Sequence, residues 1–445
     1  MGVGAREGHN DDNHHREETF MGIKPGYLAL AGLLAVPSAW AVEYDFSGDI
    51  DVRAFGRLPA AGSYENGFEQ RLRVQSDIRL QDGVSVHAGV NLINDTWRGD
   101  GSGDVNALQQ SQPFTLGRDH RTVTLDYGYV QIPLGDWNLR AGRQIANWNF
   151  GITVADDRRD RIMILGPVAE GVTFLAGGDQ RQKGTLDDRK DDGYLLFAGF
   201  VGNTNDWSWG ALLGHYVGDD EKDGAGDYEG GRFYAPRDGT LISPWAQGEF
   251  GQVKVTTGAH YLGGGDAVYT NDTFAGFLRG GFELSDSFNL EAQYFFNIGG
   301  SLIEPGFDAF SSLIHSSPRH DATATYIGAL DMRGLGKVSR EFSGMGDQDI
   351  DRHLLAVRGT YSPHASWQLK LAAGWVRYDG MAPNLGQTSD DPDRTEDVVF
   401  GDMQLHYDVT PSTSLWATYG YADTANLIDG RDSVDAVSLN LRTRF

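Results

Sequence analysis

The chain has 445 residues, no cysteine and a formal net charge of -25 at pH 7. The lack of cysteine excludes disulfides, thiolate catalysis and cysteine metal sites, and the acidity argues against nucleic acid as a partner. Sixty glycines and 11% aromatic residues, with only 40% hydrophobic residues, indicate many strands joined by tight turns. The body of the chain has no run of 18 or more apolar residues, so helical membrane spans are excluded.

The first predicted element is a secretory signal peptide at 21–41. Lys24 supplies its positive charge, and the residues from Tyr27 to Val36 form a short apolar core. The triplet Ala39-Trp40-Ala41 has the small-x-small pattern of a cleavage site. We therefore expect the mature protein to begin at Val42.

Residues 1–20 are polar and do not resemble a signal. We expect them to be an extension upstream of the true start, which would be Met21. The mature chain, 42–445, is then one domain, an outer-membrane β-barrel.

Behind the leader, apolar and polar residues alternate with the period of two that places them on opposite faces of a strand. In the segment 288–298, Leu290 and Tyr294 share the apolar face, which is expected to meet lipid, while Glu291 and Gln293 share the polar face, which is expected to meet water. By the same alternation, Leu439 is expected to face lipid and Asn440 water. The strands predicted in this way cover 44–54, 68–80, 84–94, 121–132, 137–143, 159–165, 171–179, 193–202, 207–217, 240–250, 252–262, 273–284, 288–298, 353–361, 367–378, 398–409, 414–422 and 434–445. These are about eighteen strands, and sixteen also fit because three segments have ambiguous faces.

The segments between these strands alternate in length. Short turns fall on one side, and the other side receives the long segments 55–67, 95–120, 144–158, 180–192, 218–239, 263–272, 299–352, 379–397 and 423–433. Short periplasmic turns, long extracellular loops and an even strand number are typical of a single transmembrane antiparallel β-barrel, an all-β fold. Such a barrel can cross a bilayer although the mean hydropathy is only -0.39.

The last strand, Val437 to Phe445, alternates apolar and polar residues and closes on phenylalanine. It resembles the terminal strand of bacterial outer-membrane barrels. Aromatic residues lie on the apolar face near the short turns, where they are expected to form an interfacial girdle: Tyr44, Trp137, Trp207, Phe288, Trp367 and Tyr407.

Charged residues on the opposite face are expected to line the lumen. Arg71 and Arg73 lie two positions apart on one strand, and Asp77 shares their parity. Further along, 156–161 carries six charges in succession, which cannot face lipid. A wall that carries both signs can orient water and polar solutes; mutual neutralisation of a wet wall is the alternative.

Gly142-Arg143-Gln144, followed by this charged cluster, resembles a region of Gram-negative general porins and of the alginate-export barrel family. The resemblance implies that this stretch feeds a pore constriction; a solvated external loop is the alternative. The residues expected to line the pore or its constriction are Arg53, Arg71, Arg73, Asp77, Arg140, Arg143, Asp156, Asp157, Arg158, Arg159, Arg161 and Glu291.

No catalytic or metal-binding motif is recognisable, and no Ser, His and Asp set can be assembled from the sequence. We therefore expect no enzyme, no catalytic residue, no cofactor and no metal site. The acidic segments 218–229 and 389–393 are read as solvated loops, with divalent cations as an alternative occupant.

The sequence thus predicts a porin in the cell outer membrane for passive diffusion of small hydrophilic solutes or ions. Its partners would be outer-membrane lipid, lipopolysaccharide and the solutes, and a homo-oligomer is compatible with this reading. One alternative is a substrate-specific barrel for polysaccharide export of the alginate-export type. Another is an adhesin or an outer-membrane enzyme on a barrel scaffold.

Overall fold

The structure is a computed structural model. It describes residues 42–57, 64–96, 123–182, 193–204, 206–217, 238–263, 272–298, 308–310, 351–379, 395–428 and 431–445. The chain divides into two units, Met1–Val42 and Glu43–Phe445, and the second contains all the described strands. The signal peptide, its cleavage site, the extension at 1–20 and the acidic segments 218–229 and 389–393 lie outside the described residues and stay predictions.

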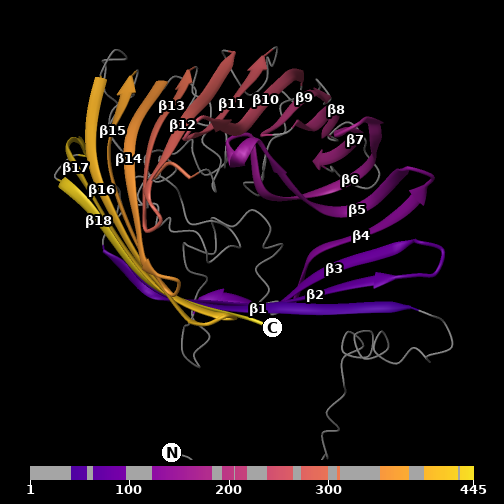
Figure 1. The fold of residues 1–445 in the computed structure, drawn as a ribbon, viewed down its shortest axis with the longest axis horizontal. Helices are drawn as coiled ribbons and strands as arrows, with labels where there is room; N and C mark the ends of the chain where they lie inside the picture. The colour runs from indigo at the N-terminus through magenta and orange to yellow at the C-terminus, as the bar shows by residue number, and fades with distance from the viewer. Residues whose placement is uncertain are drawn as a thin grey trace, which may run out of the picture. The chain divides into compact units, whose positions relative to one another are not determined.

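The second unit is built from strands that follow one another around a ring (Figure 1). Their bounds are β1 Glu43–Arg57, β2 Glu65–Arg79, β3 Ser85–Thr96, β4 Thr124–Leu134, β5 Trp137–Trp148, β6 Val154–Ala169, β7 Val172–Gln182, β8 Gly193–Thr204, β9 Trp207–Val217, β10 Asp238–Phe250, β11 Val253–Gly263, β12 Thr273–Ser285, β13 Phe288–Ile298, β14 Asp351–His364, β15 Trp367–Asp379, β16 Thr395–Thr410, β17 Thr413–Ile428 and β18 Arg431–Arg444. A short 3-10 helix, η1, covers Asn149–Gly151. No helix in the described part of the chain is long and apolar enough to cross a membrane.

The ring is closed because the first and last strands also pair with each other. β1 runs antiparallel to β18, from Asp49 opposite Arg444 to Arg57 opposite Ala436. Every other pairing joins consecutive strands and is antiparallel, so the 18-stranded sheet has no free edge. This confirms the all-β single barrel, and the sixteen-stranded alternative is wrong.

The outer face carries the apolar side chains that the alternation placed there. Leu290, Tyr294 and Leu439 are 43%, 42% and 51% exposed, as residues that would face lipid must be. Near the short turns, Trp367 and Tyr407 stack with ring centroids 4.4 Å apart. The outer surface therefore has the apolar band and interfacial aromatic residues of a membrane barrel.

The inner face is less polar than the sequence indicated. An apolar cluster of buried side chains covers the inside of β6 and β8 to β11; it comprises Met163, Leu195, Phe197, Tyr216, Leu241 and Leu262. Gln293 and Asn440, which the alternation placed in water, are 1% and 0% exposed. The expectation that both are wet is wrong, because other groups cover the inner wall: the Gln293 amide, for example, donates to the carbonyl oxygen of Asp308 at 3.1 Å.

Candidate functional site

The hairpin of β5 and β6 leaves the barrel wall in the half that carries the hairpin tip. β4 pairs with β5 only from Leu134–Trp137 up to Gly128–Arg143, and β6 pairs with β7 only from Ala169–Val172 up to Asp160–Gln180. Beyond these points the two strands pair with each other alone. Residues 144–158 therefore do not form the expected external loop; they extend the hairpin.

The tip of this hairpin reaches strands far around the ring. The Trp148 indole donates to the carbonyl oxygen of Ser243 on β10 at 2.9 Å. The Asn149 amide donates to Ser243 Oγ at 3.0 Å and to the carbonyl oxygen of Ala259 on β11 at 2.8 Å. Because β10 is four strands away from β6 in the ring, the hairpin crosses the interior, and its end, η1, lies against β10 and β11 (Figure 1).

Two local features permit this departure. Gly142 has a φ of 126°, and a Cβ there would lie 2.4 Å from the carbonyl oxygen of Gly128, so only glycine fits. At the tip, Asn149 and Phe150 both have positive φ, 57° and 55°, and the T-shaped contacts of Phe150 with Trp245 and Phe277 hold the turn in place. The glycine of the predicted Gly142-Arg143-Gln144 motif thus marks the bend where the hairpin turns inward.

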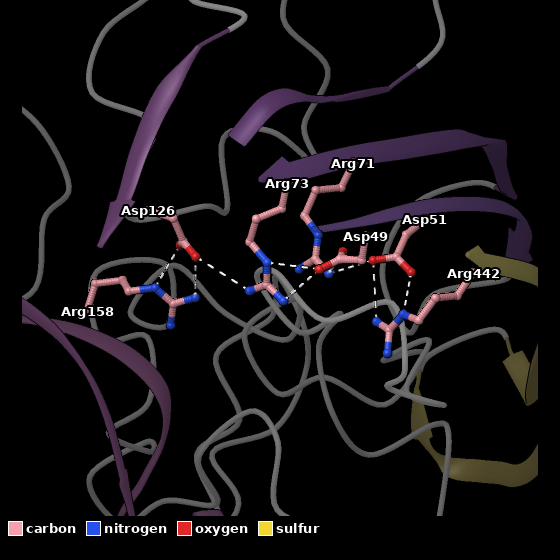
Figure 2. Close-up of polar contacts among 7 residues, drawn as sticks. All are labelled: Asp49, Asp51, Arg71, Arg73, Asp126, Arg158 and Arg442. Atoms are coloured by element: carbon pink, nitrogen blue, oxygen red, sulfur yellow. Dashed lines mark hydrogen bonds and ion pairs between the residues drawn. The ribbon is translucent and has the colours of Figure 1, made fainter. Parts of the chain in front are cut away.

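One face of the hairpin joins a chain of ion pairs on the inner wall (Figure 2). Asp49 accepts from Arg71 at 2.9 Å and from Arg73 Nε at 3.0 Å. Asp126 on β4 then links Arg73, at 3.5 Å, to Arg158, whose Nε donates at 2.7 Å.

At its other end, the chain of ion pairs crosses from β1 to β18, the two strands that close the barrel. Asp51 accepts from Arg71 Nη2 and from Arg442 Nε, both at 2.5 Å. The network therefore runs from β18 over β1, β2 and β4 to β6, with four guanidinium groups and three carboxylates (Figure 2). Most members are deeply buried; the Arg73 side chain, at 18% exposure, is the most open of those whose ion pairs are described.

The opposite face of the hairpin carries a second group of ion pairs. Arg159 lies 2.7 Å from Asp157 and 3.4 Å from Asp179 on β7. Arg161 contacts Asp179 at 2.5 Å and places its guanidinium over the Phe197 ring, 4.6 Å from the centroid. Both faces of the hairpin are therefore tied to the wall through arginine–aspartate pairs, which are the stronger class of hydrogen bond.

The remaining predicted residues are spread along the inner wall. Arg140 donates from Nε to Gln131 Oε1 at 2.7 Å, and Arg53 lies over the Phe55 ring at 5.9 Å. Arg143 is 3.6 Å from Asp160. Asp77 contacts His87, Glu291 pairs with Arg358 at 2.8 Å, and the Asp156 side chain is not among those described. The structure thus brings Arg71, Arg73, Asp157, Arg158, Arg159 and Arg161 together around the hairpin and leaves Arg53, Arg140 and Glu291 apart from it.

Sequence reasoning missed a second inward segment, Asp308-Ala309-Phe310, within the expected long loop 299–352. Ala309 and Phe310 are 0% and 3% exposed. The Asp308 carbonyl oxygen accepts from Arg279 at 2.7 Å, and the Phe310 ring lies 3.9 Å from the Arg358 guanidinium carbon. No sequence pattern signals this contact.

Asp308 also forms an ion pair with Arg358, at 2.6 Å. Burial alone would raise the pKa of Asp308, but the positive charges of Arg358 and Arg279 and the hydrogen bonds from Arg358 and the Phe310 amide lower it to about 2. The carboxylate is therefore ionised over the physiological range, and it anchors the segment to β14.

Comparison with known proteins supports this architecture. The barrel is similar to Pseudomonas aeruginosa OccK3 (OpdO), with a TM-score of 0.54 and 12% identity over 90% of this chain and 96% of that one. It is also similar to Acinetobacter baumannii OccAB4 (TM-score 0.56, 8% identity, 92% and 100% covered) and to P. aeruginosa OccK8 (OprE) (0.53, 11%, 90% and 98%). Its fold is that of outer-membrane porin barrels. No family model and no curated protein matches the sequence.

These identities are low, so the likeness concerns the fold. Together with the closed ring and the apolar outer face, it identifies the chain as an outer-membrane barrel, as the sequence predicted. The resemblance to the alginate-export family stays a prediction.

Proposed function

We propose that the barrel is a channel for passive diffusion of small hydrophilic solutes or ions across the outer membrane. The observation that carries the proposal is the ion-paired hairpin that crosses the interior. Charged side chains at membrane depth are costly unless they face a polar interior, and they commonly mark solute pathways. A hairpin fixed across the interior by paired charges would narrow that pathway.

The charge pattern favours a weakly selective channel over a polysaccharide exporter. An exporter for a polyanion would need a continuous basic track. In the ion-pair network of Figure 2, by contrast, each arginine contacts an aspartate. Paired opposite charges cancel at a distance, and the screening length at physiological salt is about 8 Å. We therefore expect Arg73, the most exposed arginine of this network, to act on a passing ion more than its buried neighbours do.

Single-channel recording of the purified barrel in a planar bilayer tests the proposal. We expect discrete conductance steps and, in a salt gradient, a reversal potential close to zero. The matched control is the same preparation after heat denaturation, which should give no steps. A folded barrel that inserts without conducting would contradict the proposed channel, and a strong anion preference would favour the exporter.

A further inference from the structure

Three residues near a short turn form a hydrogen-bonded relay on the inner wall. Ser85 Oγ lies 2.9 Å from Nε2 of His87, and Nδ1 of the same ring contacts Asp77 Oδ1. Ser85 and His87 stand two positions apart on β3 and so project from one face, while Asp77 is directly opposite His87 in the β2–β3 register. The pairing of the strands assembles a serine, a histidine and an aspartate in the order of a nucleophile, its base and an orienting acid.

The chemistry of the groups sets the direction of the hydrogen bonds. An ionised carboxylate can only accept, so Nδ1 of His87 carries the proton that it donates to Asp77. In the neutral ring Nε2 is then the acceptor, and Ser85 must donate its hydroxyl proton to it. The Tyr129 ring stacks on His87, with centroids 4.6 Å apart and planes 17° from parallel, and this holds the imidazole in position.

We propose that Ser85 is an activated nucleophile and that this relay hydrolyses small carboxylic esters that enter the lumen. Ser85 is only 5% exposed, whereas the His87 and Asp77 side chains are 19% and 44% exposed. A substrate has to reach the hydroxyl past the partly exposed side chain of His87, which restricts it to small esters. Two cations share the cross-strand row of Ser85: Arg79 is directly opposite it on β2, and Arg140 is two strands away and donates to the intervening Gln131 at 2.7 Å. Either guanidinium can stabilise a developing oxyanion.

The proposed hydrolysis needs no reactant other than the ester and water. Ser85 Oγ attacks the ester carbonyl carbon while its proton passes to Nε2 of His87, and a tetrahedral intermediate forms. The bond to the alcohol oxygen breaks as the imidazolium returns the proton to it, which leaves acyl-Ser85 and free alcohol. Water then attacks acyl-Ser85 by the same route and releases the carboxylic acid.

The chain contains its own negative control. Ser414, Asp408 and His406 are the same three residue types, but Ser414 donates directly to Asp408 at 2.6 Å, and His406 also contacts Asp408, at 3.0 Å. In this second set the serine donates to the carboxylate instead of the imidazole, which is the stronger base. Activation of Ser85 through His87 should therefore leave Ser414 unreactive.

The test is covalent labelling of the full chain, folded in detergent micelles, with methanesulfonyl fluoride, a serine reagent small enough for the restricted access. Peptide mass spectrometry should find the adduct on Ser85 and not on Ser414. His87→Gln should slow the labelling by about 10²-fold or more, because the general base is lost. Asp77→Asn, in which an amide N–H can face Nδ1 and reverse the tautomer, should slow it too and serves if His87→Gln does not fold.

Electrophoretic mobility without heating shows which preparations are folded. The proposal is overturned if folded wild-type protein gives no adduct at Ser85, if Ser85 and Ser414 react at equal rates, or if the folded His87 or Asp77 variant is labelled as fast as wild type. A relay that serves only the structure would give one of these results. Hydrolysis of p-nitrophenyl acetate that disappears in Ser85→Ala would add turnover to the labelling.

Discussion

Arg158 holds the carboxylate of Asp126 with two hydrogen bonds, from Nε at 2.7 Å and from Nη2 at 3.0 Å. The two residues belong to β6 and β4, which are separated in the ring by β5. The contact exists only because the hairpin of β5 and β6 bends away from the wall. Both residues are only 4% exposed. A buried, bidentate pair between non-neighbouring strands fixes where the hairpin lies.

The first prediction concerns this pair. Arg158→Ala should lower the free energy of unfolding by about 3–5 kcal/mol, because it removes the bidentate partner of a buried carboxylate. The double variant Arg158→Met with Asp126→Leu should recover most of the loss, since no unpaired charge stays behind. Urea unfolding of the barrel in lipid vesicles measures both. Equal losses in the single and the double variant would show that the unpaired buried charge is not the cause of the destabilisation.

The second prediction concerns the tip of the hairpin. Asn149→Gly keeps the left-handed backbone but removes the amide that bonds to Ser243 and Ala259, so the tip should come loose and the conductance should rise and become noisier. Gly258→Ala should act in the same direction, because its Cβ would lie 1.7 Å from Asn149 Oδ1. Gly401, where a Cβ meets nothing within 4 Å, is the control position. Quiet, unchanged channels in both variants would mean that the tip does not narrow the pathway.

The third prediction concerns ion preference. Arg73→Ser removes a positive charge at the partly exposed link of the network, so the reversal potential in a salt gradient should move toward cation preference. The shift should shrink as salt is raised, because screening shortens the reach of the charge. Lys254→Ser also removes one charge, but from an exposed pair with Glu283, and should change little. A shift of equal size in both variants would place Arg73 outside the ion path.

The fourth prediction concerns the outer face. Leu439→Arg should cost about 2–4 kcal/mol if the residue lies near the bilayer midplane. Because the chain has no cysteine, single cysteines report on exposure: a water-soluble thiol reagent should label Glu283→Cys but neither Leu439→Cys, in lipid, nor Asn440→Cys, in the packed inner wall. Labelling at 439 would show that the strand is turned the other way.

The fifth prediction concerns pH. The pKa of Asp308 is lowered from 3.8 to about 2, so the docking energy of this carboxylate is fully present above about pH 4 and is lost as the pH falls toward 2. The segment should therefore stay docked at neutral pH and loosen below about pH 4. Asp308→Asn should weaken the docking at pH 7 already and abolish its acid dependence. Protease cleavage near Phe310, measured from pH 7 to pH 2 with pepsin at the acid end, would follow the change.

The alternation of side chains predicted the fold because lipid and the interior demand opposite chemistry from adjacent residues. All eighteen predicted segments lie on observed strands. The largest error in a strand is in β6, predicted at 159–165 and found at Val154–Ala169. There Asp157, Arg158 and Arg159 are all buried, because both faces of the inward hairpin have charged partners. The assignment of strands from one apolar and one polar face fails in a strand segment of which neither face meets lipid.

The site was predictable in part. The parity of Arg71 and Arg73 placed both on the inner wall, and the charges at 156–161 pointed to the interior. Their partners could not be predicted, because Asp126 reaches Arg158 only after the bend at Gly142. The Ser85 relay was missed for a related reason: Ser85 and His87 are neighbours in sequence, but the register that brings Asp77 to them is a property of the β2–β3 pair.

The pairing of β1 with β18 has a consequence for the order of assembly. Hairpins between consecutive strands need only local contacts, whereas the seam joins residues as remote as Asp51 and Arg442, 391 positions apart. Contacts between distant residues form slowly, because the intervening chain must first be ordered. The buried ion pair between these two residues should therefore form late in folding. A chain in which either residue is neutralised should accumulate as an open sheet, with β1 and β18 unpaired.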